Sequence, residues 1–278
     1  MRKVNPPFIA RVVRYYIQNT PIKFGRSLLV EMTQLLIRRK RFIDKIWNGD
    51  YYNFDLGQWI DRNLFFFGGY EKREQKFIQS RLDKTSVFMD IGANSGLYSL
   101  VASKKCSKVF AFEPDIITRR ILKKNIRSNN RNNIKVIPYA LTDKNAKAIF
   151  YTNPTNRGMS SLFYHGGKLK RTIVKTDTLD NVLEALRIRE VTLIKMDIEG
   201  GELKALKGSV KTIERFKPMF LVEVNKIYTT DAGFQISDIY NFFQKFNYSP
   251  YSIEGDGSRK VSKEEFLGTI QKNIFFEH

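Results

Sequence analysis

The sequence predicts an α/β domain with a mostly parallel sheet, preceded by a basic helical N-terminal extension. Short apolar runs of strand length alternate with segments of helical periodicity from about residue 70 onward. This alternation is typical of domains in which helices cover both faces of a parallel sheet. A glycine-rich turn at residues 92–96 directly follows the apolar run 87–91. Since ligands bind at the carboxyl ends of the strands in such sheets, this turn is the first candidate for a site.

Composition limits the function classes. The chain has 278 residues, 42% of them apolar, which fits one domain with an extension, or at most two domains, and excludes disorder for most of its length. A single cysteine, Cys106, excludes an internal disulfide framework and a cysteine-based zinc site. The two histidines, His165 and His278, exclude a histidine-rich metal site and disfavour a Ser-His-Asp triad.

The charge balance predicts an acidic partner. Lys and Arg number 48 against 28 Asp and Glu, a formal net charge of +20. Nucleic acid, an anionic membrane face and a phosphorylated substrate all fit this charge, as does a plain lysine-rich solvated surface. No segment reaches the roughly 18 uncharged apolar residues of a membrane-spanning helix. Arg11 and Arg14 interrupt the apolar stretch 8–17, so it is no secretory signal, and a cytoplasmic location is expected.

Residues 1–69 are predicted to form a helical extension, and residues 70–278 the main domain. Residues 1–45 hold eleven Lys or Arg against Glu31 and Asp44. Three readings of this segment stay open: a packed extension, a basic amphipathic surface at an anionic inner membrane face, and a homodimer interface. The aromatic stretch Trp47, Tyr51, Tyr52 and Trp59 predicts a packed subdomain or a stacking surface for a sugar or base. Apolar residues at helical spacing carry the helix prediction: Ile9, Val12, Val13, Tyr16 and Ile17, then Leu28, Leu29, Met32, Leu35 and Leu36.

The main domain is predicted to contain alternating helices and strands. The apolar runs predict strands at 86–91, 108–113, 134–139, 191–198, 219–225, 248–253 and 273–277. The helical patterns fall at 70–83, 96–104, 115–128, 178–186, 202–216 and 236–246. Residues 146–177 are expected to form short extended pieces, with turns at 153–154 and 166–167.

The turn at 92–96 is predicted to hold a ligand. Glycines at 92 and 96 allow a tight turn and close approach of a ligand to the backbone, and a helix N-terminus favours an anionic group. The turn is neither a dinucleotide fingerprint nor a phosphate-binding P-loop. Glu113 ends the next strand about twenty residues later, where a carboxylate accepts hydrogen bonds from a ribose diol.

These motifs resemble the FkbM family of class I S-adenosylmethionine-dependent methyltransferases. The resemblance rests on D-I-G-A-N-S-G at 90–96, F-E-P at 112–114, K-T-D-T-L-D at 175–180, L-I-K-M-D-I-E-G-G-E at 193–202 and L-V-E-V-N at 221–225. It implies a Rossmann-like, seven-stranded, mostly parallel sheet flanked by helices, with S-adenosylmethionine as cofactor. The family's known members mostly methylate hydroxyls of sugars or polyketides, which implies a hydroxyl-bearing small molecule or glycan as the acceptor.

The same resemblance assigns roles around the cofactor. Asp90, Gly92 and Gly96 are expected to shape the pocket for its methionine part, and Asn94 to contact its carboxylate. Glu113 is expected to hold the ribose and Leu141 to cover the adenine ring, with Asp143 structural and the loop 156–162 near cofactor or substrate.

Carboxylates are the available general bases for an alcohol acceptor, because histidine is nearly absent. Asp197 is predicted to be the base or a metal ligand, with Glu199 and Glu223 as partners. Strand alternation places Lys195 on the side of Asp197 and Glu199. An oxygen-rich site of this kind suits Mg²⁺ or Mn²⁺, although no spacing is diagnostic. Glu202 follows this group in the first turn of the predicted helix, and the alternative to a place in the site is a structural acid at the helix N-terminus. For Glu223 the alternative to a place in the site is an internal ion pair with Lys195.

The sequence therefore predicts an O-methyltransferase that acts on a sugar hydroxyl of a glycan, glycolipid or related molecule. The alternative is a nucleic-acid methyltransferase that modifies an RNA ribose or a base, which the net charge favours. Against that alternative, Ile198 and Glu199 follow Asp197 and place negative charge where a base edge or phosphate would pass. A cofactor-binding scaffold without activity is the third reading, and the intact Asp90, Glu113 and Asp197 oppose it.

Overall fold

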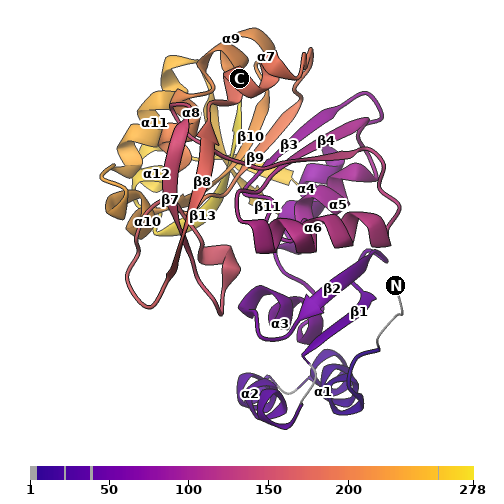
Figure 1. Cartoon of the computed structure of the whole chain (residues 1–278). Helices are drawn as coiled ribbons and strands as arrows, with labels where there is room; N and C mark the ends of the chain where they lie inside the picture. The colour runs from indigo at the N-terminus through magenta and orange to yellow at the C-terminus, as the bar shows by residue number, and fades with distance from the viewer. Residues whose placement is uncertain (1–4, 22, 38–39, 256) are drawn as a thin grey trace.

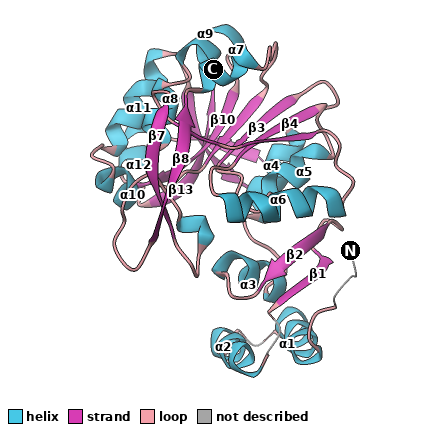
Figure 2. Cartoon of the chain, viewed as in Figure 1, coloured by secondary structure: helices cyan, strands magenta, loops and turns pink. Residues whose placement is uncertain are grey.

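The computed structural model describes residues 5–21, 23–37, 40–255 and 257–278. A large α/β domain forms most of the molecule, and a smaller N-terminal part lies at one pole (Figure 1). Helices flank the central sheet, and a smaller sheet lies in front of it (Figure 2). Arg2, Lys3, Arg38 and Arg39 of the basic N-terminal segment lie outside the described residues.

The central sheet confirms the predicted class I fold and adds one strand to the predicted seven. Its order is β12-β11-β13-β10-β9-β3-β4-β5, in which β3, β4, β5, β9 and β10 pair in parallel and β13 is antiparallel to β10. The unpredicted eighth strand, β12, pairs with β11 across a short hairpin at the edge. The strands are β3 (Val87–Ile91), β4 (Lys108–Phe112), β5 (Ile134–Ile137), β9 (Leu193–Met196), β10 (Met219–Asn225), β11 (Ser249–Glu254), β12 (Gly257–Lys260) and β13 (Gln271–Glu277).

Successive side chains of the strands pack alternately into two hydrophobic cores, one on each face of the sheet. Met89 packs with α7, α8, α9, α11 and α12, whereas its neighbour Phe88 packs with α4 and α5. This is the two-residue period expected of strands covered on both sides. The helices are α4 (Lys72–Ser80), α5 (Leu97–Ser103), α6 (Ile116–Ser128), α7 (Leu179–Ala185), α8 (Glu202–Lys207), α9 (Val210–Phe216), α10 (Lys226–Asp231), α11 (Ile236–Lys245) and α12 (Lys263–Leu267).

A second sheet has the order β6-β8-β7, and two of its strands, β7 and β8, come from the segment 146–177, where only short extended pieces are expected. β7 (Ala146–Thr152) and β8 (Lys170–Asp177) form a long antiparallel hairpin, and its connection contains a 3₁₀ turn, η1 (Arg157–Met159). β6 (Tyr139–Leu141) joins β8 in parallel. The strand predicted at 134–139 is thus two strands in two sheets, and the break falls at Pro138, which has no N–H to donate to a ladder.

The N-terminal region is only partly helical, which corrects the prediction of a helical extension. It contains α1 (Phe8–Asn19), α2 (Arg26–Leu36) and α3 (Trp59–Phe66), but also an antiparallel hairpin of β1 (Arg41–Lys45) and β2 (Tyr51–Asp55). Its buried side chains, including Ile17, Phe42 and Phe65, share a core with Leu100 of α5. The boundary at residue 70 stays a prediction. Among the described residues, no helix combines the length and apolar character needed to cross a bilayer.

Candidate active site

A cavity of about 470 Å³ opens at the carboxyl ends of the parallel strands. Strand order reverses between β3 and β9, which is where ligands bind in open α/β sheets. The volume lies in the range of small-molecule and cofactor sites. The cavity is lined by the turn after β3, the end of β4, the end of β9, β10, the β7–β8 connection and α3.

The turn after β3 packs directly on the end of β9. Gly92 has a φ of 81°, and a Cβ atom built there would lie 1.9 Å from the backbone oxygen of Asp197. Asn94 also has a left-handed φ, of 49°, and its backbone N–H donates to Glu113 Oε2 over 3.0 Å. Gly92 and Asn94 line the cavity, whereas Gly96 lies behind it at the start of α5, where a Cβ atom would meet the side chain of Leu122 at 2.4 Å.

Glu113 and Leu141, for which the sequence predicts contacts with the ribose and the adenine ring, both line the cavity. The carboxylate of Glu113 accepts from the backbone N–H of Asn94 and, over 2.8 Å, from that of Asp115. Burial raises the pKa of Glu113 to about 8, even though these hydrogen bonds act in the opposite direction.

Asp90, which is predicted to shape the cofactor pocket, and Asp143, which is predicted to be structural, do not line the cavity. Asp90 is fully buried in β3 and accepts from the Ser99 hydroxyl over 2.5 Å, so its part is to support the turn from behind. Burial raises its pKa. Asp143 accepts from the Thr142 hydroxyl and does not reach the cavity, as expected for a structural residue.

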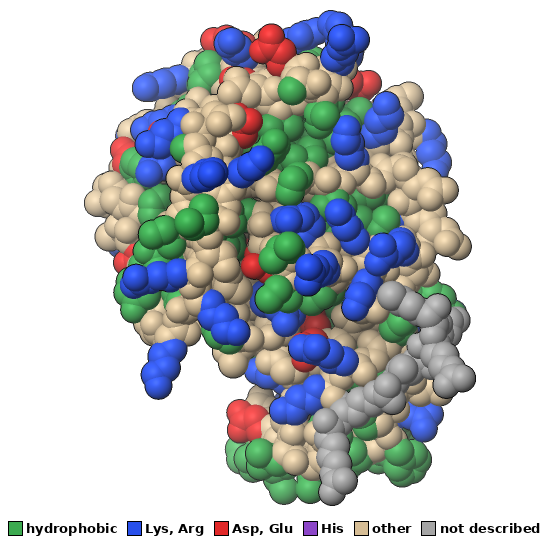
Figure 3. All heavy atoms as spheres, in the orientation of Figure 1, with side chains coloured by type: hydrophobic (Ala, Val, Ile, Leu, Met, Phe, Trp, Pro, Cys, Tyr) green, Lys and Arg blue, Asp and Glu red, His purple; other side chains and the backbone are tan. Residues whose placement is uncertain are grey.

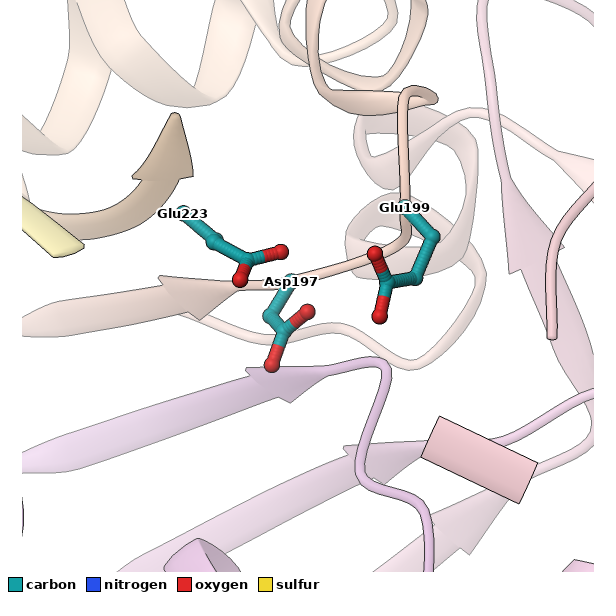
Figure 4. A group of neighbouring side chains, drawn as sticks. All are labelled: Asp197, Glu199 and Glu223. Atoms are coloured by element: carbon teal, nitrogen blue, oxygen red, sulfur yellow. The ribbon is translucent and has the colours of Figure 1, made fainter. Parts of the chain in front are cut away.

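Three carboxylates meet where β9 and β10 end and line the same cavity, as the sequence predicts. Asp197, Glu199 and Glu223 each offer an oxygen, and these oxygens lie within 4.8 Å of one another (Figure 4). β9 ends at Met196, and the backbone then turns sharply, with a φ of 54° at Glu199. This turn aims Glu199 at Glu223, which lies in the neighbouring strand β10.

The cluster holds more carboxylate oxygens than its hydrogen bonds satisfy. Lys195 Nζ lies 2.8 Å from Asp197 Oδ2, and not against Glu223, so the alternative Lys195–Glu223 ion pair is wrong. Glu223 Oε1 accepts from Gln271 Nε2 over 2.8 Å. One carboxylate oxygen of Glu199 and one of Glu223 are buried without a hydrogen-bond partner. Burial, and then neighbouring carboxylates, raise the pKa of both residues well above the ordinary range.

Lys195 stays charged in this setting. Burial alone would lower its pKa, but Asp197, Asp90 and Glu71 outweigh burial and raise it. The ammonium group also lies 4.7 Å from the centre of the Tyr98 ring. A permanent cation is therefore held against Asp197 at the edge of the cavity.

Glu202 and His165 hold the acidic turn in place. The Glu202 carboxylate accepts from the backbone N–H groups of Ile198 and Gly200 over 2.9 and 3.0 Å, so its helix-terminal role is structural. Burial raises its pKa to about 7. One ring nitrogen of His165 lies 2.9 Å from the backbone oxygen of Glu199, and the other 2.8 Å from Asp231. His165 does not line the cavity.

Several cavity residues are missed by sequence reasoning, because they come from distant segments. Glu71 accepts from the Tyr98 hydroxyl and from Asn273 Nδ2, and so joins the start of α4 to α5 and β13 beside the cluster. Trp59 and Ile60 of α3 form a further wall. The β7–β8 connection is tied to α3 because Gln58 Nε2 donates to the Pro154 carbonyl and Gln58 Oε1 accepts from the Arg157 N–H. Of these, only Trp59 carried a local signal, its place in an aromatic-rich stretch.

Residues 90–250 match the family model described as the methyltransferase FkbM domain. The chain belongs to the FkbM methyltransferase family. Every predicted site residue lies within the matched segment, which confirms the resemblance stated from the motifs. Trp59, Ile60, Glu71 and Gln271 lie outside it, so this FkbM protein completes its cavity with residues from both flanks of the family domain.

Two curated relatives match parts of the chain. The hexuronic acid methyltransferase AglP of Haloferax volcanii is 27% identical over 141 residues, which cover 50% of this chain and 56% of AglP. The uncharacterized protein MJ1452 of Methanocaldococcus jannaschii is 40% identical over 60 residues, 22% of this chain and 23% of that protein. The chain thus spans about half the length of the first relative and less of the second.

Solved structures resemble the chain at low identity. The methyltransferase FkbM from Methylobacillus flagellatus KT has a TM-score of 0.48 and 19% identity, over 71% of this chain and 44% of that one. SMU.1697c from Streptococcus mutans, solved in complex with SAH, has a TM-score of 0.45 and 12% identity, over 74% and 96% of the two chains.

Proposed function

We propose that this FkbM protein transfers a methyl group from S-adenosylmethionine to a hydroxyl of a sugar. One observation carries the proposal: the glycine turn after β3 and the three carboxylates at the ends of β9 and β10 line the same cavity. A cofactor on the glycine side would present its methyl group to an acceptor on the carboxylate side.

The glycine side fits the cofactor. The exposed backbone at Gly92 and Asn94 suits the methionine part, since no side chain keeps a ligand from Gly92 and α5 begins directly after this turn. Glu113 lines the cavity and would accept from the ribose hydroxyls, with Leu141 against the adenine ring.

The carboxylate side fits proton removal from an alcohol. In the proposed step the acceptor oxygen attacks the sulfonium methyl carbon, the carbon–sulfur bond breaks and its electron pair stays on sulfur. The hydroxyl proton passes to Asp197, which is part-exposed and lines the cavity. A positioned base of this kind contributes on the order of 10²–10⁴-fold to the rate. Lys195 holds the Asp197 side chain in place through the 2.8 Å ion pair.

We further propose that Glu199 and Glu223, with Asp197, bind one Mg²⁺ or Mn²⁺ ion. The support is that Glu199 and Glu223 each keep one buried carboxylate oxygen without a hydrogen-bond partner, and that the three side chains lie close together (Figure 4). Hard divalent cations prefer such an all-oxygen set. A bound cation would orient the acceptor hydroxyl and favour its deprotonation.

A sugar is the acceptor class that the cavity supports best. Trp59 lines the cavity with 45% of its surface exposed, and an aromatic face of this kind packs against a sugar ring. The relative AglP is named for a hexuronic acid, which agrees with a sugar acceptor. The net charge of +20 favours a nucleic acid instead, as the second candidate. The acidic cluster opposes that candidate, because a phosphate backbone would have to pass Asp197 and Glu199.

Label transfer from methyl-labelled S-adenosylmethionine into fractionated cell extract tests the function. Label is expected in the glycan and glycolipid fraction, and a loss of 10²-fold or more is expected for Asp197→Asn. Asp143→Asn is the matched control, since it changes a carboxylate outside the cavity. Label in the nucleic-acid fraction would overturn the sugar assignment, and an unchanged rate for Asp197→Asn would overturn the role of Asp197.

Mn²⁺ binding to the purified protein, followed by electron paramagnetic resonance, tests the cation site separately. One bound ion is expected for the wild type, and at least tenfold weaker binding for Glu199→Gln and for Glu223→Gln. Glu214→Gln, at an exposed position on α9, is the control. Absence of Mn²⁺ binding by the wild type would refute the cation proposal and leave the assignment of Asp197 untouched.

A further inference from the structure

The two N-terminal helices expose an apolar surface that their own packing does not use. We define the N-terminal patch as nine large side chains of α1, of α2 and of the turn before α2, all exposed. At the pole formed by α1 and α2, apolar side chains dominate the surface (Figure 3). The patch consists of Phe8, Val12, Tyr15, Tyr16, Phe24, Leu28, Met32, Leu35 and Leu36.

Each helix carries two apolar stripes, one facing inward and one facing solvent. In α1, Ala10, Val13 and Ile17 are buried, and in α2 Val30 and Thr33 are buried. The outward stripes repeat one spacing in both helices, i, i+4, i+7 and i+8, which places four side chains on one helical face. They run Phe8, Val12, Tyr15, Tyr16 in α1 and Leu28, Met32, Leu35, Leu36 in α2.

The outward stripes are too exposed to be explained as the edges of a core. Phe8 of one stripe is 74% exposed and Leu35 of the other is 87% exposed, and Phe24 in the turn before α2 is 97% exposed. Single exposed apolar residues are ordinary, but a contiguous group of this kind marks a surface that is covered by another body. The helices have 12 and 11 residues, which suits helices that lie in an interface and not helices that cross a bilayer.

The charge around the patch decides what covers it. Residues 1–45 hold eleven Lys or Arg against Glu31 and Asp44. Two of the eleven are already paired, Arg14 with Asp44 over 2.6 Å and Arg41 with Asp55 over 2.9 Å. Arg11, Lys23 and Lys40 are exposed beside the patch. Two copies of the chain joined through this face would bring two basic rims together, whereas an anionic lipid surface complements them.

We infer that α1 and α2 dock the protein on an anionic membrane surface, with the N-terminal patch in the acyl boundary and its basic rim among the headgroups. The inference does not depend on the chemistry of methyl transfer, because membrane binding is measured without cofactor or acceptor. Since α3 packs on α1 and also lines the cavity, docking would keep the cavity wall formed by Trp59 close to the lipid surface.

Cosedimentation of the full chain with lipid vesicles tests the inference. Binding is expected to vesicles of phosphatidylcholine mixed with phosphatidylglycerol, and much weaker binding to phosphatidylcholine alone or at high salt. The double change Phe24→Ser and Leu35→Ser is expected to weaken binding about tenfold or more. Ile173→Ser is the matched control, because Ile173 is 76% exposed on β8, outside both patch and cavity.

A second measurement keeps the test valid if the double variant folds poorly. Phe24→Trp replaces one exposed aromatic side chain with another, and its tryptophan emission is expected to shift to the blue when the anionic vesicles are added. Ile173→Trp is expected to show no shift. Failure of the wild type to bind either vesicle would overturn the inference. The inference would also be overturned by a wild type that binds no vesicles and instead forms a concentration-dependent dimer, which the Phe24 and Leu35 changes dissociate. A second copy of the chain would then cover the patch.

Discussion

Gly92 and Asp197 touch through their backbones at the base of the cavity. A Cβ atom at Gly92 would lie 1.9 Å from the Asp197 carbonyl oxygen, and the Asp197 N–H donates to the Ile91 carbonyl. The turn that would hold the cofactor and the turn that carries the acidic cluster therefore share one contact. The distance between the two halves of the proposed reaction is set by the absence of a side chain at residue 92.

Replacing Gly92 by alanine should separate the two turns. We expect Gly92→Ala to weaken S-adenosylmethionine binding at least tenfold in calorimetry and to lower the melting temperature, because backbone has to move. Gly166→Ala is the control, since Gly166 has a similar φ of 85° with nothing within 4 Å of its added Cβ. The control variant is expected to lose only the unfolding free energy that a left-handed conformation costs an alanine, about 1–2 kcal/mol. Equal effects of the two changes would show that strain, and not the contact with Asp197, is what matters.

Glu113 should make nucleoside binding depend on pH. Its pKa is raised to about 8 in the ligand-free protein, so the carboxylate that would accept from a ribose diol is mostly protonated below that pH. We expect the affinity for 5′-methylthioadenosine to increase as the pH rises through about 8. This probe has the ribose and adenine but no amino-acid part that titrates in the same range.

The variant Glu113→Gln isolates this effect. It should bind 5′-methylthioadenosine about tenfold more weakly than the wild type above that pH, with a flat profile, because a neutral amide loses the charge-assisted hydrogen bonds. Titrations by calorimetry across the pH range measure both proteins. A pH dependence that persists in Glu113→Gln would assign the titration to another group.

The sequence predicts the sheet and the site because both follow local patterns. Apolar runs of strand length identify β3, β4, β9 and β10, and the carboxyl end of each run places Gly92, Glu113, Asp197 and Glu223 at one edge. Parallel strands bring those ends together whatever lies between them. The convergence of Asp197, Glu199 and Glu223 is thus a consequence of topology that can be read from the chain.

The N-terminal hairpin had a local sequence signal that the prediction of a helical extension did not use. Asn48 and Gly49 stand between β1 and β2, an Asn-Gly pair is typical of a tight hairpin turn, and Gly49 has a φ of 86°. Glu71 and Gln271 had no local signal. They reach the cluster only through tertiary contacts, Glu71 with Asn273 and Gln271 with Glu223, between segments some fifty to two hundred positions apart.

Asp61 should make the stability of the N-terminal region depend on pH. The side chain is buried in α3, where its carboxylate accepts from the Asp55 N–H over 2.7 Å and from the Tyr52 hydroxyl over 3.3 Å. Burial raises its pKa from 3.8 to about 7. A raised carboxyl pKa contributes stability below the unfolded value and loses it as the pH rises through the folded value.

We therefore expect the wild type to lose unfolding free energy relative to Asp61→Asn as the pH rises from about 4 to about 7, by on the order of 2–4 kcal/mol, and the difference to stay level at higher pH. Denaturant unfolding at a series of pH values measures the difference. Glu190→Gln, at an exposed position, should run parallel to the wild type. A constant gap between wild type and Asp61→Asn would mean that Asp61 does not titrate in this range.

Trp59 should contribute to acceptor binding and not to the chemical step. It lies at the start of α3, and its backbone N–H donates to the Thr155 carbonyl. Its ring meets the Tyr70 ring edge-on, with 6.1 Å between the ring centres. A sugar ring stacked on it would be bound equally in the ground and transition states, so truncation should raise KM and leave kcat unchanged. For Trp59→Ala we expect KM for the methylated acceptor to rise about tenfold. Phe67→Ala is the matched control, because Phe67 is 39% exposed just after the same helix and does not line the cavity. A fall in kcat with KM unchanged would instead place Trp59 among the groups that align the reacting atoms.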